Sequence, residues 1–319
     1  MSDNRRQEAA LSDAPSTPAA PVRRATLPNG LEVAYQGKAE LEQIYDDIFE
    51  KRVYTQHGIT LRDGDCVFDV GGNIGLFTLF VATGWPGARI WTFEPAPPLF
   101  AILSANTAPY RDRIHLFNCG LSSRPGEAAL TFYPHTSGMS SFYPDEQAER
   151  EALRTLLHIE MARGKEGVGD LLQYEEELLA ERFRHETWTC PLRTLSEVIH
   201  EEGVTRIDLL KIDVEKAEMD VLAGLREDDW GKVQQAVLEV HDLGDRLREV
   251  SDLFRSHGFS VTLEQEDLYQ GSDRWNLYAV RETLAAIPDP GRRRPDRAAA
   301  LDRIEDRARR LRDAMKGRR

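Results

Sequence analysis

The sequence predicts an α/β fold with a Rossmann-like, largely parallel sheet of seven strands, and two observations predict it. From residue 65 onward, short apolar runs alternate with helix-like segments, as in repeated βαβ units. The first apolar run also ends in an acidic, glycine-rich turn, VFDVGGNIG, at residues 67–75. A turn of this kind between a strand and a helix is typical of sheets that bind a ligand at their carboxyl edge.

Each expected element follows from the spacing of its apolar residues. Strands are short apolar runs, and helices have apolar residues three and four positions apart. The last two strands follow one another after a short polar stretch, so we expect them to form an antiparallel hairpin at one edge of the sheet. The strands are expected near 65–70, 89–94, 113–118, 206–212, 235–241, 259–264 and 275–281, with helices near 73–83, 97–107, 194–202, 216–226 and 246–257.

The chain is expected to carry additions on either side of this domain. Residues 1–24 are rich in Ala, Pro, Ser and charged residues, which predicts a disordered lead. Residues 25–64 are expected to cap the ligand cleft, because apolar residues between 41 and 49 recur at helical spacing. Residues 65–284 form the predicted ligand-binding domain, and residues 285–319 are an arginine-rich tail expected to form a basic helix.

An insertion interrupts the domain after its third strand. A strand is expected near 127–133, and residues 144–187 are expected to be mainly helical. Such an insertion over the carboxyl edge of the sheet is either a lid or substrate platform, or an element that only packs on the body. The apolar stripes that predict its helices are Leu153, Leu157 and Met161, followed by Leu171, Leu172, Leu178, Leu179 and Phe183.

Charge and apolar content exclude several classes of partner. The formal net charge of −13 repels a phosphate backbone, so we expect no nucleic-acid partner. No apolar stretch approaches the about eighteen residues of a membrane span, and no apolar signal core is present, so we expect a cytoplasmic protein without a membrane partner. Cys66, Cys119 and Cys190 lack metal-binding spacing and lie in or beside apolar runs, which predicts buried thiols.

The glycine spacing in the turn distinguishes between two kinds of ligand. Nicotinamide and flavin dinucleotides require glycines at the first, third and sixth places, because a pyrophosphate lies against the helix end. Here the pattern is acid-x-Gly-x-x-x-Gly, formed by Asp69, Gly71 and Gly75, which is typical of S-adenosylmethionine (AdoMet) sites. We expect the helix N-terminus to offer free N–H groups, and Glu94, at the end of the next strand, to accept the ribose hydroxyls. The sequence therefore favours AdoMet over a nicotinamide cofactor.

Three acidic residues follow the strand expected near 206–212. Asp213 ends this strand and is expected to face the cleft, where it can orient the cofactor's amino group, bind a cation or take a proton. Glu215 shares the face of Asp213 if the strand continues that far. Glu218 lies inside the next helix and is expected to make only a cap or a surface pair.

A second polar group closes the strand expected near 235–241. Glu239 and His241 share a face, and the strand ending in Asp213 is expected beside them. Because an imidazole titrates near neutral pH, His241 is predicted to act as the general base on a hydroxyl, together with these acids. Alternatively, Asp213, Glu239 and His241 or Asp242 bind Mg²⁺ against a substrate oxygen. We favour catalysis without a metal.

Several motifs together resemble the FkbM family of AdoMet-dependent methyltransferases. They are VFDVGGNIG, TFEP, FNCGLSS, SGMSSF, LLKIDVEKAEMDVLAGL and VLEVHD, and the resemblance covers residues 50–281. It implies the class I methyltransferase fold and methylation of a hydroxyl on a small natural product, such as a polyketide, a peptide or a sugar, free or bound to a carrier protein. Two features depart from the family: Lys216 stands where glycine is common, and the helical insertion is longer than usual.

The resemblance also implies which residues surround AdoMet. Asp69 and the glycine turn would hold its methionine part, Glu94 its ribose, and residues 118–120 its adenine. The alternatives to an O-methyltransferase are a non-catalytic AdoMet-binding partner protein, an N-methyltransferase and, less favoured, a nicotinamide oxidoreductase. The expected cofactor-binding residues are Asp69, Gly71, Gly72, Asn73, Gly75, Glu94, Asn118, Cys119, Gly120 and Asp213, and the expected catalytic residues are Asp213, Glu239 and His241.

Overall fold

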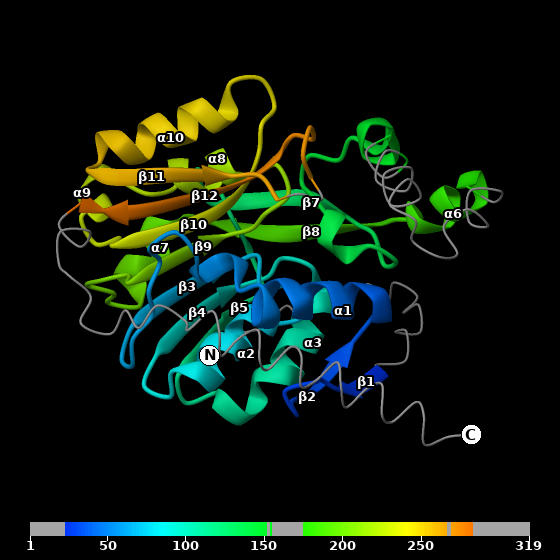
Figure 1. The fold of residues 1–319 in the computed structure, drawn as a ribbon, viewed down its shortest axis with the longest axis horizontal. Coiled ribbons are helices and arrows are strands. Elements are labelled where there is room, and N and C mark those ends of the chain that lie inside the picture. The colour runs from blue at the N-terminus through cyan, green and yellow to red at the C-terminus, as the bar shows by residue number, and fades with distance from the viewer. Residues whose placement is uncertain (1–22, 152–153, 155–174, 267–268, 283–319) are drawn as a thin grey trace, which may run out of the picture. The chain divides into compact units, whose positions relative to one another are not determined.

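The computed structural model describes residues 23–151, 154, 175–266 and 269–282. Its centre is a seven-stranded sheet with the strand order β11-β12-β10-β9-β3-β4-β5 (Figure 1). Strand β12 is antiparallel to both of its neighbours, whereas the other neighbouring strands of this sheet run parallel to one another. This order confirms the predicted seven-stranded α/β fold and its antiparallel last strand. The strands are β3 (Cys66–Val70), β4 (Arg89–Phe93), β5 (Ile114–Phe117), β9 (Leu209–Ile212), β10 (Gln235–His241), β11 (Phe259–Glu264) and β12 (Arg274–Arg281).

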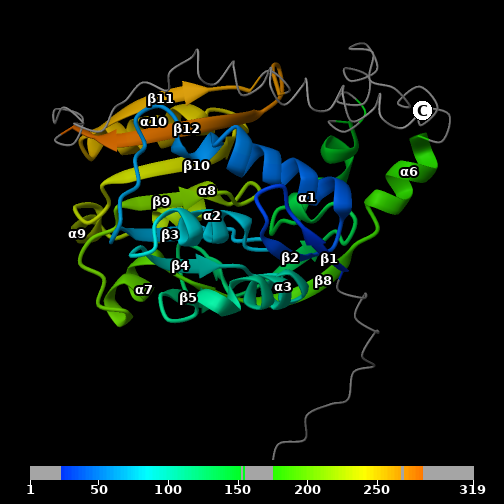
Figure 2. The same cartoon turned by 60° about the horizontal axis from the view of Figure 1, so that its bottom comes forward.

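Helices cover both faces of the sheet, because alternate strand residues point to opposite sides. Val67 and Leu209 pack into one apolar cluster with α1, α2 and α3, whereas Phe68 and Leu210 pack into a second cluster with α7, α8 and α10. The two helical layers can be followed in Figure 2. The helices are α1 (Lys38–Tyr45), α2 (Leu76–Gly84), α3 (Pro97–Thr107), α7 (Leu195–Glu201), α8 (Glu218–Ala223), α9 (Glu227–Trp230) and α10 (Arg246–Ser256).

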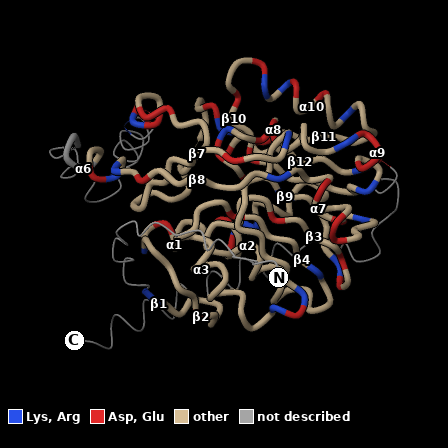
Figure 3. Tube along the Cα trace, turned by 180° about the vertical axis from the view of Figure 1, so that it is seen from behind, with Lys and Arg blue, Asp and Glu red and all other residues tan. Residues whose placement is uncertain are grey.

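Helix α2 follows the glycine turn and is buried on all sides. The residues from Leu76 to Ala82 are all buried, and neither α2 nor α3 contains a charged residue. Figure 3 shows this difference from α10, which carries both acidic and basic residues. A helix that is apolar all round must be covered on both sides, and here the sheet covers one side and the N-terminal segment the other.

The N-terminal segment contains a hairpin that the sequence did not predict. Arg23 and Arg24 belong to β1, which pairs with β2, so the predicted disordered lead is wrong for these two residues. The remaining residues of that lead, 1–22, lie outside the described residues. The helical spacing between 41 and 49 is confirmed, because Leu41, Tyr45 and Ile48 are buried. The elements are β1 (Arg23–Thr26), β2 (Glu32–Tyr35), a π-helical turn η1 (Asp46–Glu50) and a 3-10 turn η2 (Val53–Thr55).

The insertion after β5 begins and ends in a second, three-stranded sheet with the order β6-β8-β7. Strand β7 is the strand expected near 127–133, whereas β8 was not predicted and ends the helical part at residue 185. Leu179 and Phe183 are buried beside Tyr133, as their apolar spacing predicts. The elements are β6 (Gly120–Leu121), β7 (Gly126–Phe132), a 3-10 turn η4 (Ser137–Met139), α6 (Glu175–Arg182) and β8 (Glu186–Arg193), and a further 3-10 turn η3 (Ala108–Tyr110) precedes β5.

Several predictions concern residues that the structure does not describe. These are the helical positions Leu153, Leu157, Met161, Leu171 and Leu172, the side chain of Leu178, and the basic tail 285–319. The three cysteines are free and buried, as expected. None of the described helices combines the length and the apolar character that crossing a membrane requires.

Candidate functional site

A cavity of about 1100 Å³ lies at the carboxyl edge of the sheet. It is bounded by the turn after β3, the ends of β4, β9 and β10, the loop 136–143 and the loop before β12. Among the described residues that line it, nine are Asp or Glu and five are Lys or Arg. The cavity therefore favours a ligand that carries positive charge.

The glycine turn after β3 forms one wall of this cavity. Gly71 and Gly75 have φ values of 83° and 89°, and Asn73 has a φ of 48°, so all three are left-handed. A Cβ atom on Gly71 would lie 1.9 Å from the carbonyl oxygen of Asp213, which brings the ends of β3 and β9 into direct backbone contact. Gly71, Gly72 and Asn73 line the cavity, whereas Gly75 is not among the described residues that do so.

The N–H groups of the turn itself, residues 71–75, are occupied, whereas those expected to be free belong to the first turn of α2, which begins at Leu76. Gly71 and Gly72 donate to the carbonyl oxygen of Phe93, and Gly75 donates to that of Gly72. The N–H of Asn73 donates to Glu94, and the N–H of Ile74 donates to the Asn73 side chain. All five consecutive donors therefore have acceptors within the chain. The turn has a rigid backbone but offers no anion-binding nest to a pyrophosphate.

Glu94 lies at the end of β4 and is 5% exposed. Its Oε2 accepts from the N–H of Asn73 at 2.8 Å, and its Oε1 accepts from the N–H of Ala96 at 2.9 Å. Each oxygen retains a second lone pair, and the residue lines the cavity. Burial raises the pKa of Glu94 to about 7, against the opposing effect of the two N–H bonds and of Lys211. The carboxylate is thus fixed at the cavity wall, and each of its oxygens keeps a lone pair for a further hydrogen bond.

Asp69 does not line the cavity among the described residues, although the sequence places it in the cofactor site. It is fully buried beneath the turn, where its Oδ1 lies 3.0 Å from Lys211 Nζ and its Oδ2 accepts from the Thr78 hydroxyl at 2.6 Å. Lys211 Nζ also donates to the carbonyl oxygen of Gly71 at 2.7 Å. Asp69 therefore supports the turn through Lys211 instead of facing a ligand.

Lys211 is a buried ammonium group to which the sequence assigned no role. It lies in the motif LLKIDVEKAEMDVLAGL, and its own signal is a charged residue inside the apolar run LLKI. The register places it beside Asp69 on the neighbouring strand, and its Nζ lies 3.5 Å from Asp213. The Tyr54 and Phe77 rings lie 5.3 Å and 5.9 Å from Nζ. Burial disfavours the charge, but Asp69 and Asp213 outweigh it and raise the pKa of Lys211.

Asp213 follows the end of β9 and lines the cavity, as the sequence predicts. Its Oδ2 accepts from the Tyr54 hydroxyl at 2.7 Å. Burial opposes its ionisation, but Lys211 and the Tyr54 hydroxyl together hold the pKa of Asp213 below its ordinary value. Asp213 is therefore a fixed negative charge at the cavity wall. Tyr54 comes from the N-terminal segment, and no pattern in the sequence indicated its role.

Residues 118–120, which the resemblance assigns to adenine, do not all line the cavity. The Asn118 amide donates to the carbonyl oxygens of Glu94 and Pro95 at 2.8 Å and 3.1 Å, and Asn118 is not among the described lining residues. Cys119 and Gly120 do line the cavity. Asn118 therefore joins the ends of β4 and β5, and its two successors form the wall.

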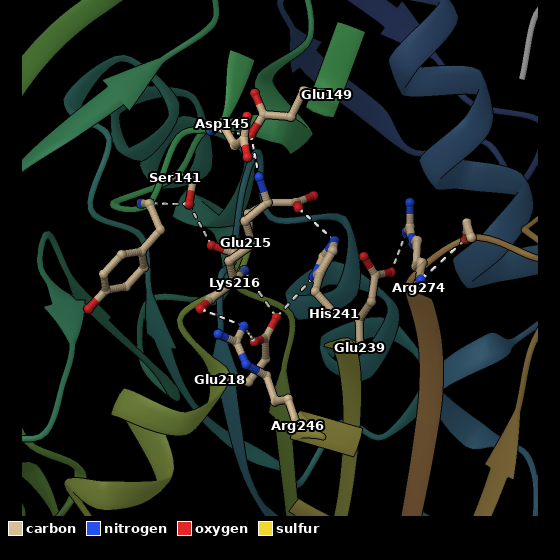
Figure 4. A network of polar contacts seen from close by, with 12 residues as sticks. Ser141, Asp145, Glu149, Glu215, Lys216, Glu218, Glu239, His241, Arg246 and Arg274 are labelled. Atoms are coloured by element: carbon tan, nitrogen blue, oxygen red, sulfur yellow. Dashed lines mark hydrogen bonds and ion pairs between the residues drawn. The ribbon is translucent and has the colours of Figure 1, made fainter. Parts of the chain in front are cut away.

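His241 lies between two carboxylates, as Figure 4 shows. Its Nε2 is 3.0 Å from Glu215 and its Nδ1 is 3.0 Å from Glu218. Burial alone would lower the pKa of His241, but these carboxylates raise it to about 11. Both ring nitrogens are occupied and the ring carries a proton at neutral pH, which disfavours the predicted general-base role.

Glu218 is fully buried, so the expectation that it makes only a cap or a surface pair is wrong. It accepts from Arg246 at 3.2 Å and from the N–H of Lys216 at 3.1 Å, besides its contact with His241. Its burial depends on Arg246, which lies on α10 and is distant in the sequence. Glu218 therefore fixes the orientation of the imidazole.

Glu239 is 4% exposed and lies beside His241. Its Oε2 forms an ion pair with Arg274 of β12, while its Oε1 is buried and has no hydrogen-bond partner in the described part of the chain. Burial raises the pKa of Glu239 to about 8, against the effect of Arg274. The described side chains whose ligand atoms converge are Glu215, Glu239 and His241, with all three atoms within 4.8 Å of one another.

This convergence corrects the metal-ligand set expected from the sequence. Glu215 takes the place proposed for Asp213, although β9 ends at Ile212 and does not continue to Glu215. Asp242 accepts from the N–H of Leu247 at 3.0 Å and so holds the start of α10. Among the described residues, neither Asp213 nor Asp242 belongs to the converging group.

Two contacts join the insertion to this end of the cavity. The Ser141 hydroxyl donates to the carbonyl oxygen of Glu215 at 2.6 Å, and Lys216 Nζ lies 2.6 Å from Glu149. Lys216 has a φ of 67°, the left-handed conformation that glycine adopts most readily. The side chain at this position, where the family resemblance implies glycine, thus contacts the insertion directly.

Comparisons with known proteins agree with one another. The family model for the methyltransferase FkbM domain matches residues 69–261. The chain is similar to the 31-O-demethyl-FK506 methyltransferase FkbM of Streptomyces tacrolimicus, with 43% identity over 262 residues that cover 82% of this chain and 97% of that protein. The methyltransferase sdnD of Sordaria araneosa is 32% identical over 256 residues, covering 76% of this chain and 91% of that protein. The AMB antimetabolite synthetase AmbE of Pseudomonas aeruginosa is 44% identical over 286 residues, which cover 86% of this chain but 13% of that protein.

Proposed function

The chain belongs to the FkbM family of AdoMet-dependent methyltransferases, and on that basis we propose that it methylates a hydroxyl oxygen of a small natural product. It is thus an enzyme. The observation that supports the proposal most directly is the cavity at the carboxyl edge of the sheet. One end of it has a glycine turn beside a buried carboxylate, and the other has a cluster of acidic and basic side chains. A volume of about 1100 Å³ exceeds the roughly 300–1,000 Å³ of ordinary ligand pockets, so it accommodates a cofactor together with an acceptor.

The residues present fit AdoMet better than a dinucleotide. A Cβ on Gly72 would lie 2.4 Å from Thr92, so the turn packs closely and presents bare backbone to the cavity. Glu94 offers free lone pairs to ribose hydroxyls. The excess of acidic lining residues attracts a sulfonium cation and repels a pyrophosphate. A nicotinamide cofactor would also find the five turn N–H groups already occupied.

We place the methionine part of the cofactor against Gly71, Gly72 and Asp213, the ribose at Glu94, and the adenine along Cys119 and Gly120. Asp213 is held ionised by Lys211 and Tyr54 and accepts a bond from the cofactor's amino group. Asp69 stays in the site as the group that fixes Lys211 beneath the turn.

Bound AdoMet supplies an electrophilic methyl group on a positively charged sulfur, so the protein's task is to position the acceptor and allow loss of one proton. The acceptor's place is the polar end of the cavity, where Glu215, His241 and Arg274 face the space and Glu239 lies behind them. We therefore keep Glu239 and His241 as acceptor-side residues and assign Asp213 to the cofactor.

The acceptor class rests on the relatives. The Streptomyces tacrolimicus relative is named for a 31-O-demethyl substrate, which is an oxygen acceptor. The match to a synthetase over 13% of that protein's length is consistent with an acceptor tethered to an assembly-line protein. We accordingly propose an alcohol acceptor, either free or carried by a partner protein.

Removing the Glu94 carboxylate should weaken S-adenosylhomocysteine binding by about tenfold or more, since charge-assisted bonds to the ribose are lost. Isothermal titration of the Glu94→Ala variant measures this. Glu202→Ala is a control, because Glu202 is an exposed acid bonded to Trp91 that does not line the cavity. Equal affinity in wild type and Glu94→Ala would refute the ribose assignment.

Binding of S-adenosylhomocysteine should also depend on pH through Glu94. Because the pKa of Glu94 is about 7, the carboxylate that accepts the hydroxyls is the main form above pH 7 and is protonated below it. Affinity should therefore fall by about tenfold between pH 8 and pH 6, the change expected for one titrating group. Titrations across this range measure the effect. A flat profile in the wild type, or an unchanged slope in Glu94→Gln, would contradict it.

Methyl transfer to a panel of acceptors tests the function as a whole. The panel contains free alcohols, the same alcohols on a carrier protein, and matched amines, each assayed for S-adenosylhomocysteine release. Transfer to alcohols supports the proposal, and transfer to amines alone would replace it with N-methylation. Cofactor binding without transfer to any acceptor would favour a non-catalytic binding protein.

A further inference from the structure

We propose that Glu215, Glu239 and His241 bind a divalent cation that holds the acceptor's oxygen beside the cofactor. The three side chains come from two segments, since Glu215 follows β9 and the other two belong to β10. Figure 4 shows them facing one another, with Arg274 and Glu218 at the outside of the group. The cation site is new to this chain, and its role toward the acceptor rests on the proposed function.

One carboxylate oxygen of Glu239 lacks a partner. The residue is 4% exposed, and Oε1 has no hydrogen-bond partner among the described residues. A buried carboxylate oxygen without a partner is costly. In Figure 4, one oxygen of Glu239 meets Arg274 and the other faces His241. A cation between Glu239, Glu215 and His241 supplies the partner that this oxygen lacks.

The orientation of His241 also suits a metal ligand. Its Nδ1 lies 3.0 Å from Glu218, which is fully buried and bonded to Arg246. Imidazoles that bind metals commonly donate one ring N–H to a carboxylate, which leaves the other nitrogen for the metal. Here that other nitrogen is Nε2, and it faces Glu215 at 3.0 Å. Without a metal, a proton lies between His241 Nε2 and Glu215. A bound cation would replace that proton and bind both groups.

The spacing of the three ligand atoms fits an octahedral ion. Bonds of about 2.1 Å place adjacent ligands of such an ion about 3.0 Å apart and opposed ligands about 4.2 Å apart. His241 Nε2 and Glu215 lie 3.0 Å apart, as adjacent ligands do, and all three ligand atoms lie within 4.8 Å of one another, so a small contraction completes the geometry. Two carboxylate oxygens and one imidazole nitrogen suit Mn²⁺ or Mg²⁺ and leave several positions open.

The open positions face the acceptor's side of the cavity. Glu215 and His241 line the cavity, whereas Glu239 lies behind them. An acceptor hydroxyl bound to the cation loses its proton to water more readily, because the metal lowers the pKa of a bound O–H group. The alkoxide oxygen then forms a bond to the methyl carbon while the bond between that carbon and sulfur breaks. The electron pair of the broken bond stays on the sulfur, which becomes neutral.

Titration of the metal-stripped full-length protein with Mn²⁺ tests the site, with free Mn²⁺ measured by electron paramagnetic resonance. We expect one site in the wild type, and affinity lowered by about tenfold or more in Glu239→Gln and in Glu215→Gln. The matched control is Glu264→Gln. Glu264 pairs with His57 at 2.7 Å on the surface but belongs to no converging group of described residues. This control should bind Mn²⁺ as the wild type does.

Each possible result either supports or overturns the cation site. Absence of Mn²⁺ binding at millimolar concentration, or equal loss of affinity in Glu264→Gln, overturns the cation site. Wild-type affinity in both Glu239→Gln and Glu215→Gln does the same. S-adenosylhomocysteine binding, measured without metal in every variant, checks that each one is folded. It also separates the two proposals: cofactor binding and methyl transfer that persist without Mn²⁺ binding leave the proposed function standing. Mn²⁺ binding without any methyl transfer leaves only the metal site.

Discussion

Gly71→Ala should destabilise the protein by about 2–5 kcal/mol, because it combines left-handed strain of about 1–2 kcal/mol with overpacking of about 1–3 kcal/mol. The glycine has a φ of 83°, and a Cβ would lie 1.9 Å from the carbonyl oxygen of Asp213. That obstacle is backbone, so it cannot rotate away. Relief requires the ends of β3 and β9 to separate, which breaks the cavity wall. Urea unfolding measures the change in the free energy of unfolding.

Gly64→Ala is the matched control for this prediction. Gly64 precedes β3 with a φ of 88°, and a Cβ atom added there would meet no described atom within 4 Å. It therefore carries the backbone strain without the collision and should cost only about 1–2 kcal/mol. If the two variants lose equal stability, the close approach of Gly71 to Asp213 is not what requires glycine.

Lys211→Met should cost about 3–5 kcal/mol, the penalty observed when one partner of a buried ion pair is removed. Lys211 is 3% exposed, and its ammonium group lies 3.0 Å from Asp69 and 3.5 Å from Asp213. Methionine keeps most of the volume but leaves two carboxylates without their cation. The carbonyl oxygen of Gly71 loses its donor as well. Chemical denaturation of the variant measures the loss.

Two further variants make the Lys211 prediction specific. Lys51→Met removes a partly exposed ammonium group that pairs with Asp46 and Asp47, and it should cost no more than about 1 kcal/mol. Adding Asp69→Asn to Lys211→Met should restore part of the lost stability, because one uncompensated charge disappears. A Lys211→Met variant as stable as Lys51→Met would mean that the buried charges do not depend on this ammonium group.

The fold could be predicted where local pattern and burial agree. The strands from β3 to β12 in the main sheet are apolar runs, so their positions follow from the sequence alone. Two strands, β1 and β8, had sequence patterns too weak to predict. Strand β1 is four residues long and mostly exposed, and β8 contains Pro191, which removes a ladder donor. Both are held by their pairing partners, which composition does not reveal.

The end of the cavity at the glycine turn could be predicted better than the end at His241. The turn and Glu94 are placed by short spacings along the chain, and both line the cavity. The end at His241 depends on contacts between distant segments. Glu218 is buried because Arg246 lies against it, and Glu239 pairs with Arg274 through the register of an antiparallel strand. The protonation of His241 depends on these neighbours, which raise its pKa to about 11. The ordinary pKa of histidine therefore misled the prediction of a general base.

The position of β12 determines when the seven-stranded sheet can close during synthesis. This strand comes after β11 in the chain but lies between β10 and β11 in the sheet. The ribosome must therefore release residues 274–281 before β11 can be connected to β10 through β12 in the sheet. Until then Glu239 lacks Arg274, its ion-pair partner. A nascent chain can form the part of the cavity around the glycine turn first, and it gains the part around Glu239 only with β12, which is the last strand among the described residues.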